Sequence, residues 1–170
     1  MRVYSFPAVA ADDARVLILG SMPGVASLQA TQYYAHPRNQ FWRILTELCG
    51  LATVPDYPQR LQLLRERHLA LWDVLHSCVR PGSLDAAIEH HSAKANDLIG
   101  LLHAHPGIVR ICCNGGTAFT ALRRYFAKAL ADRFPHIDVR QLPSTSPANA
   151  SWTYARKLHA WRQALAPALS

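Results

Sequence analysis

The stretch Val16-Leu17-Ile18-Leu19-Gly20-Ser21-Met22-Pro23-Gly24 decides the fold class. Four consecutive aliphatic residues are typical of a strand that is buried on both faces, as in parallel sheets covered by helices. A turn with two glycines and a proline follows at once, and such a turn can direct backbone N–H groups outward. We therefore expect a buried strand that ends in a loop able to hold an oxyanion or the edge of a base.

Further strand-length and helical segments flank this stretch on its C-terminal side. Apolar runs that predict strands occupy residues 69–72, 108–113 and 137–142, and the polarity of the last alternates, as at a sheet edge. Helical spacing or start signals are found in residues 40–48, 58–66, 92–102 (with Ser92 as the N-cap), 117–130 and 152–165. This order predicts one α/β domain over residues 1–170: a three-layer α/β/α sandwich around a mostly parallel four-stranded sheet.

The amino-acid composition indicates which class of molecule the protein binds. The net charge is +7, and 15 of the 18 basic residues are Arg, whose planar fork suits phosphate. This balance fits nucleic-acid binding, although a basic but inert surface is the alternative. No apolar run approaches the ~20 residues that span a bilayer, and no signal peptide is recognisable, so we expect a cytoplasmic protein.

The four cysteines show no metal-ligand spacing. They are Cys49, Cys78, Cys112 and Cys113, without a Cys-x-x-Cys pair. Cys112 and Cys113 are adjacent in a predicted strand, so their side chains should point to opposite faces of the sheet. We expect buried free thiols and no metal site.

The carboxyl ends of parallel strands meet at one edge of a sheet, and ligands bind beyond that edge. Asp73, Asn114 and the loop 143–149 each follow a predicted strand, as residues 20–24 do. In the loop, two prolines flank Ser144, Thr145 and Ser146, whose hydroxyls and amides suit a DNA phosphate. These segments predict one polar pocket.

The segment 32–42 is rich in aromatic and polar residues. Tyr33 or Tyr34 could stack on an extruded base, although a core position is as reasonable. Arg38 could reach a phosphate. Asn39 could cap a helix or contribute to the site, and Phe41 and Trp42 are expected in the core.

Together these segments resemble the uracil-DNA glycosylase superfamily, most closely its hypoxanthine-DNA (deoxyinosine) glycosylase branch. The similarity extends from Val16 to about Trp161. The stretches that carry it, in order, are Gly20-Ser21-Met22-Pro23-Gly24, His36-Pro37-Arg38-Asn39-Gln40-Phe41-Trp42, Leu71-Trp72-Asp73-Val74-Leu75 with Gly82-Ser83-Leu84-Asp85, Asn114-Gly115, and Pro143-Ser144-Thr145-Ser146-Pro147. The order and spacing of these motifs are more specific than any one of them.

The chain departs from the superfamily at Met22. The first motif usually carries Asp or Asn there, and that side chain handles the catalytic water. The resemblance to the hypoxanthine branch, which shares this loss, implies Asn39 as the catalytic residue. It also implies base flipping, cleavage of the N-glycosidic bond and an abasic product of base excision repair. No Lys lies in the four loops, so no Schiff-base lyase step is expected and the enzyme should be monofunctional. Hydrolysis of this kind needs no metal, and no cofactor is expected.

Base choice can be argued from hydrogen-bonding edges. Hypoxanthine presents an acceptor at O6 and a donor at N1–H, and adenine reverses this pattern. Asp73 is the candidate acceptor for N1–H, with a purely structural carboxylate as the alternative. Asn114 could read the base, hold water or serve only as a turn residue. The residues expected to bind the base are Ser21, Met22, Pro23, Gly24, Tyr34, Asp73 and Asn114.

The expected partner is double- or single-stranded DNA containing a deaminated base. Arg38, Ser144, Thr145 and Ser146 are expected to contact its backbone. We expect a monomer associated with the nucleoid. The alternatives are a mismatch-specific uracil or thymine glycosylase, a lesion-binding module without catalysis, and an enzyme of free nucleosides.

Overall fold

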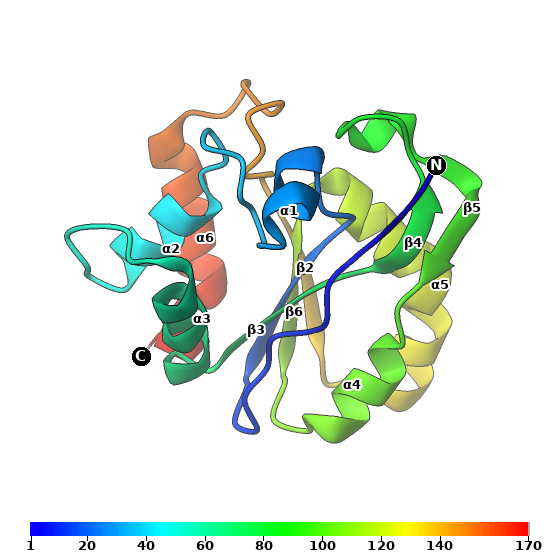
Figure 1. The fold of residues 1–170 in the computed structure, drawn as a ribbon. Helices are drawn as coiled ribbons and strands as arrows, with labels where there is room; N and C mark the ends of the chain where they lie inside the picture. Colours follow the sequence, from blue (N-terminus) through cyan, green and yellow to red (C-terminus); the bar gives the residue numbers. More distant parts are fainter. Residues whose placement is uncertain (170) are drawn as a thin grey trace.

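Figure 1 shows a sheet flanked by helices in the computed structural model, which describes residues 1–169. The central sheet has four parallel strands in the order β3-β2-β6-β7. These strands are β2 (Val16–Gly20), β3 (Leu69–Asp73), β6 (Arg110–Asn114) and β7 (Asp138–Leu142). The four predicted strands are thus confirmed, and the one with alternating polarity, β7, does lie at an edge.

All five residues of β2 are buried, because the strand lies between β3 and β6 and both of its faces are covered. Val16 and Ile18 face one hydrophobic core, and Leu17 and Leu19 face another on the opposite side. Adjacent Cys112 and Cys113 of β6 divide between the two cores in the same way, and all four cysteines are buried free thiols, as predicted. A strand with apolar side chains on both faces needs a helix layer on each side.

Helices supply both layers (Figure 1). The first core includes side chains of α2 (Phe41–Leu48), α3 (Tyr57–Glu66) and α6 (Tyr154–Leu169). The second includes those of α4 (Leu98–Ala104) and α5 (Gly116–Arg133). This arrangement is the predicted three-layer α/β/α sandwich. No helix within residues 1–169 has the length and apolarity required to cross a membrane.

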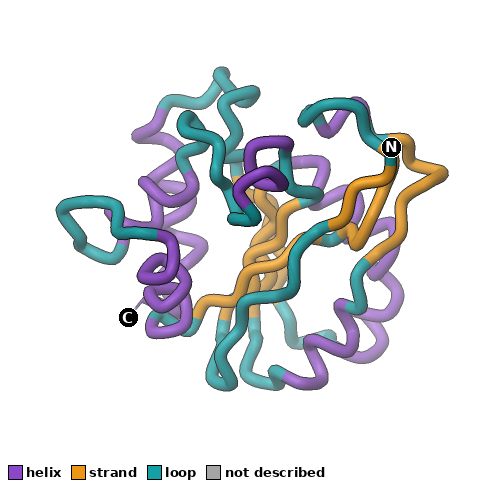
Figure 2. Tube along the Cα trace, viewed as in Figure 1, coloured by secondary structure: helices purple, strands orange, loops and turns teal. Residues whose placement is uncertain are grey.

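A second sheet was not predicted. It contains β1 (Arg2–Tyr4), β4 (Leu75–Val79) and β5 (Glu89–Ala95), joined in antiparallel pairs in the order β1-β4-β5. The chain passes from β3 into β4 through a single residue, Val74, so the two sheets lie next to each other, with the N-terminus on the second (Figure 2).

One predicted boundary was wrong. Ser92 does not cap a helix; it lies inside β5, where its hydroxyl accepts a hydrogen bond from Val79 N–H at 2.8 Å. Helix α4 begins at Leu98, and the carboxylate of Asp97 caps it by accepting from Gly100 N–H. Residues 89–95 are polar and rich in Ala, and pairing with β4 overrides their local preference. The short helices α1 (Val25–Ala30) and η1 (Asp85–Ala87) were also not expected.

Candidate active site

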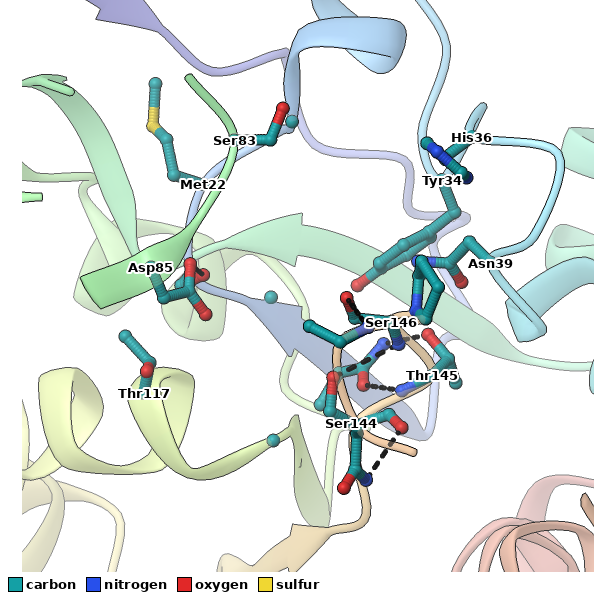
Figure 3. Close-up of a pocket in the computed structure, with 18 of the residues that line it drawn as sticks. Met22, Tyr34, His36, Asn39, Ser83, Asp85, Thr117, Ser144, Thr145 and Ser146 are labelled. Atoms are coloured by element: carbon teal, nitrogen blue, oxygen red, sulfur yellow. Dashed lines mark hydrogen bonds between the residues drawn. The ribbon is translucent and has the colours of Figure 1, made fainter. Parts of the chain in front are cut away.

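A large cleft of about 1240 Å³ lies at the carboxyl ends of the parallel strands. Its walls come from the loops that follow β2, β6 and β7, from Asp73 at the end of β3, and from residues within 33–39 and 83–86. In Figure 3, Tyr34, His36 and Asn39 lie on one side, Asp85 and Thr117 lie on the other, and Ser144–Ser146 lie between them. The predicted convergence of the strand ends is therefore present.

Tyr34 and Asp73 meet above Gly20. A Cβ atom on Gly20 would lie 2.5 Å from Asp73 Oδ1 and 2.9 Å from the Tyr34 hydroxyl oxygen. Both contacts are closer than van der Waals distance, so only glycine leaves room for this pair of polar groups. The two side chains form the floor of the cleft, and we call Gly20, Tyr34 and Asp73 the base floor.

The carboxyl group of Asp73 is unusual because it is buried without a full set of partners. The residue is 4% exposed, and Asp73 Oδ2 has no hydrogen-bond partner within residues 1–169. The pKa of Asp73 is raised to about 7, mainly by burial and also by the negative charge of Asp85, while Arg80 opposes the change. Asp73 therefore changes its protonation state near neutral pH, facing a cavity.

Tyr34 also presents an unsatisfied group. Its backbone has φ 53°, in the left-handed region, and its ring stacks on Phe41 with centroids 4.2 Å apart. The buried hydroxyl has no hydrogen-bond partner in the described chain, although the Asn114 side chain lies nearby. Burial raises the pKa of Tyr34 above its usual range, so the hydroxyl keeps its proton. Tyr33, in contrast, is a core residue that donates to Pro7 O at 2.8 Å.

Asn39 does not cap α2 as considered above, because the N-cap of that helix is Gln40. The Oδ1 atom of Asn39 accepts a hydrogen bond from Phe41 N–H at 3.0 Å, immediately before α2, and the residue lines the cleft. Its amide NH₂ group has no hydrogen-bond partner within residues 1–169. The turn therefore orients the side chain and leaves donors available to a ligand.

Asn114 is placed differently. Its Nδ2 donates to Thr145 Oγ1 and its Oδ1 accepts from Thr145 N–H, both at 3.0 Å. Thr145 is fully buried, whereas Ser144 and Ser146 on either side of it are partly exposed in the cleft. The side chain of Asn114 thus anchors the loop 143–149 to the end of β6; we call Asn114 and Thr145 the loop anchor.

The loop after β2, residues 20–24, is called the first-motif loop here. Its residues contact both the cleft and a small core cluster. Met22 borders the cleft, but it is only 7% exposed and packs in a core cluster with Leu75, Cys78 and Ile88. Ser21 donates its hydroxyl proton to Asp85 Oδ1 at 2.8 Å. Pro23 and Gly24 also line the cleft. A thioether at position 22 therefore packs this loop against the second sheet.

Several lining residues were not predicted as site residues. Asp85 ends the stretch Gly82-Ser83-Leu84-Asp85, for which no site role was predicted, and it bonds to Ser21, which lies 64 positions earlier. His36 lines the rim next to Arg38, and its Nδ1 accepts from Arg38 N–H at 3.1 Å. Trp152 also lines the cleft, with the guanidinium of Arg156 4.3 Å above its ring. Only tertiary contacts reveal these positions.

Comparisons with known proteins agree with this geometry. The model of the uracil DNA glycosylase superfamily matches residues 6–166. A hypoxanthine DNA glycosylase of Methanosarcina acetivorans is 33% identical over 156 residues, covering 89% of this chain and 91% of that protein. A protein of the same name from Methanosarcina barkeri is 35% identical over 117 residues, covering 68% of this chain and 72% of its own.

A solved structure is also similar. The solution NMR structure of a candidate uracil DNA glycosylase from Methanosarcina acetivorans superposes with a TM-score of 0.82 at 31% identity and covers both chains completely. The match of the family model across nearly the whole chain and the similarity to this solved structure lead to one conclusion. The protein belongs to the uracil DNA glycosylase superfamily.

Proposed function

We propose that the protein is a hypoxanthine-DNA glycosylase, which flips deoxyinosine out of DNA and hydrolyses its N-glycosidic bond. The family match and the names of the two relatives support a DNA glycosylase, a hydrolase of N-glycosyl compounds. The observation that carries the base assignment is the base floor, where two buried polar groups without partners face the cleft. Such groups are costly unless a ligand pairs with them.

The polar groups of the base floor are complementary to the hydrogen-bonding edge of hypoxanthine. The Asp73 carboxylate accepts the N1–H hydrogen bond, and the protonated hydroxyl of Tyr34 donates to O6. The two oxygen atoms lie within 2.9 Å of one point above Gly20, so they are close enough to contact adjacent atoms of one base. Adenine would place its N1 acceptor against the ionised carboxylate of Asp73, which leaves buried groups unpaired.

Asn39 is the catalytic residue in this proposal. An amide takes up no proton near neutral pH, so it acts by orienting a water molecule beside the sugar and by stabilising charge with its free NH₂ group. The C1′–N9 bond breaks with its electron pair on the base, the water oxygen bonds to C1′, and the proton released by water neutralises the base. An oxocarbenium-like sugar forms on this path, as in other glycosidic cleavage.

The DNA backbone is proposed to lie along the rim. Ser144 and Ser146 offer hydroxyl groups, and exposed Arg38 offers a cation. Thr145 contributes to this surface only by holding the loop, since its side chain is buried. Duplex or single-stranded DNA, a monomeric enzyme and association with the nucleoid remain parts of the proposal.

A second candidate substrate follows from the same geometry. Uracil presents an acceptor at O4 and a donor at N3–H, so the base floor pairs with uracil as it does with hypoxanthine. Single-turnover excision on duplexes containing hypoxanthine, uracil, xanthine or a G·T mismatch distinguishes these substrates. We expect hypoxanthine to be released fastest, and faster release of uracil or thymine would overturn the assignment of the base.

The same assay tests catalysis by Asn39. We expect Asn39→Ala to bind lesion DNA and to cut it on the order of 100- to 1,000-fold more slowly. Gln62→Ala removes a similar amide from the exposed surface of α3 and should leave the rate unchanged. Binding of DNA without cutting by the wild type would indicate a lesion-binding module, and turnover of free inosine without DNA affinity would indicate a nucleoside enzyme.

A further inference from the structure

Arg80 is a buried cation directly behind the first-motif loop. The residue follows β4, is 3% exposed, and has no carboxylate within ion-pair distance among residues 1–169. A guanidinium removed from water without a counterion is strongly unfavourable unless its hydrogen bonds compensate. The hydrogen bonds of Arg80 therefore indicate which parts of the chain it holds in place.

Those bonds join two turns that border the cleft. Arg80 Nη2 donates to the carbonyl oxygen of Pro23 at 2.6 Å, and Nε donates to the carbonyl oxygen of Gly82 at 2.8 Å. The neighbouring Ser83 hydroxyl accepts from Val25 N–H at 2.8 Å, which ties the same two turns together. Arg80 Nη1 has no partner in the described chain.

The bond to Pro23 sets the direction of the next amide. No peptide bond within residues 1–169 is cis, and in a planar trans peptide the N–H points opposite to the C=O. The Pro23 carbonyl points at Arg80, so the N–H of Gly24 points away from Arg80. Pro23 and Gly24 line the cleft and Arg80 does not, so this direction leads toward the cleft. The Gly24 N–H has no hydrogen-bond partner in the described residues.

We propose that Arg80 is a positioning residue for departure of the base: it orients and polarises the Pro23–Gly24 peptide so that Gly24 N–H donates to the purine as negative charge develops on it. This inference rests on the proposed glycosylase function. The cation lies behind the peptide, where its charge strengthens the amide dipole without contacting the substrate. Preorganised backbone donors of this kind act mainly in the transition state.

Single-turnover excision with two leaving bases tests this role. The substrates are a duplex with deoxyinosine and the same duplex with 8-aza-2′-deoxyinosine, whose more acidic base needs less stabilisation as it leaves. For Arg80→Met we expect a loss of about 100-fold on deoxyinosine and less than about 10-fold on the aza analogue. Affinity for DNA carrying a non-cleavable deoxyinosine analogue should stay within about 3-fold of wild type, since the donor acts after binding.

The chain offers a matched control and a conservative variant. Arg60 Nε also donates to a proline carbonyl, that of Pro55, at 2.8 Å, but on α3 outside the cleft, so Arg60→Met should leave both rates unchanged. Arg80→Lys keeps the charge but loses the pair of hydrogen bonds that joins the two turns. We therefore expect its excision rate to lie between those of Arg80→Met and wild type, with deoxyinosine again affected more than the aza analogue.

Three outcomes would overturn the inference. They are an equal loss of rate on both bases, weaker DNA binding with unchanged chemistry, and unfolding of both Arg80 variants in a thermal melt, which would leave Arg80 only a structural brace. If the wild type releases no hypoxanthine, the proposed function fails separately. The comparison of leaving bases is then made on the lesion that the wild type does cut.

Discussion

The base floor and the loop anchor lie in the same cleft but differ in how their polar atoms are satisfied. In the loop anchor, the two amide atoms of Asn114 pair with the backbone and hydroxyl of Thr145. In the base floor, Asp73 Oδ2 and the Tyr34 hydroxyl are buried without partners. Paired polar groups stabilise the fold, whereas unpaired ones gain only when a ligand arrives. The two regions should therefore respond differently to mutation, one in stability and the other in activity.

Loss of the Asp73 carboxyl group should have the largest effect on activity. We expect Asp73→Leu to slow excision of hypoxanthine on the order of 100- to 1,000-fold, because a charge-assisted contact to N1–H is lost. Asp73→Asn keeps an acceptor oxygen and should lose less. The measurement is single-turnover excision with saturating enzyme, and full activity of Asp73→Leu would remove Asp73 from base recognition.

The same carboxyl group should lower stability at high pH. Its pKa is raised from 3.8 to about 7 in the folded protein, so folding favours the protonated form. Its contribution is present below pH 4 and is lost as pH rises to about 7, by up to about 4 kcal/mol. We expect urea melts to show Asp73→Asn gaining stability relative to wild type across this interval. A constant difference from pH 4 to pH 8 would contradict the raised pKa.

Breaking the loop anchor should mainly affect stability. Asn114→Ala leaves the buried N–H and hydroxyl of Thr145 unpaired, which we expect to destabilise the fold by about 2 kcal/mol. Denaturant unfolding measures this value. The control is Asn149→Ala, which loses a partly buried bond to Ser144 O and an exposed bond from the Ser151 hydroxyl. If Asn114→Ala were fully stable but had lost base discrimination, the distinction between the two regions would be wrong.

Removing one hydroxyl from the base floor should give a moderate effect of the opposite kind. Tyr34→Phe deletes an unpartnered buried group, so stability should be unchanged or slightly higher. Excision of hypoxanthine should fall about 10-fold through loss of the contact to O6. Tyr33→Phe is the matched control, since its hydroxyl bonds to Pro7 in the core and its loss should cost stability instead. Excision rates and melting temperatures of both variants test whether Tyr34 affects activity and Tyr33 affects stability.

The smallest effects should come from the rim beside the loop anchor. Ser144→Ala and Ser146→Ala remove partly exposed hydroxyls, and we expect each to weaken DNA binding about 2- to 5-fold at low salt. Fluorescence anisotropy with a labelled duplex measures this change. Ser151→Ala, on an exposed turn outside the cleft, serves as the control. Equal affinity for all three variants would place the DNA backbone elsewhere.

Much of the framework followed from local sequence. Apolar runs predicted the four parallel strands, three of them ending at Gly, Asp or Asn, and the geometry of parallel sheets brought their ends together. The periodicity of residues 40–48 likewise predicted α2. These features depend on hydrophobic patterning, which is determined by residues that are close together in the sequence.

Other features depended on contacts between distant residues. Residues 89–95 became a strand because β4 pairs with them, and Met22 became a core residue because the second sheet covers it. Asn114 was expected in the pocket, but only its pairing with Thr145, 31 positions later, separates it from Asp73. Burial and hydrogen-bond satisfaction are properties of the packed chain, so the sequence determined which polar residues gather at the strand ends, and the tertiary structure decided which of them remain unpaired.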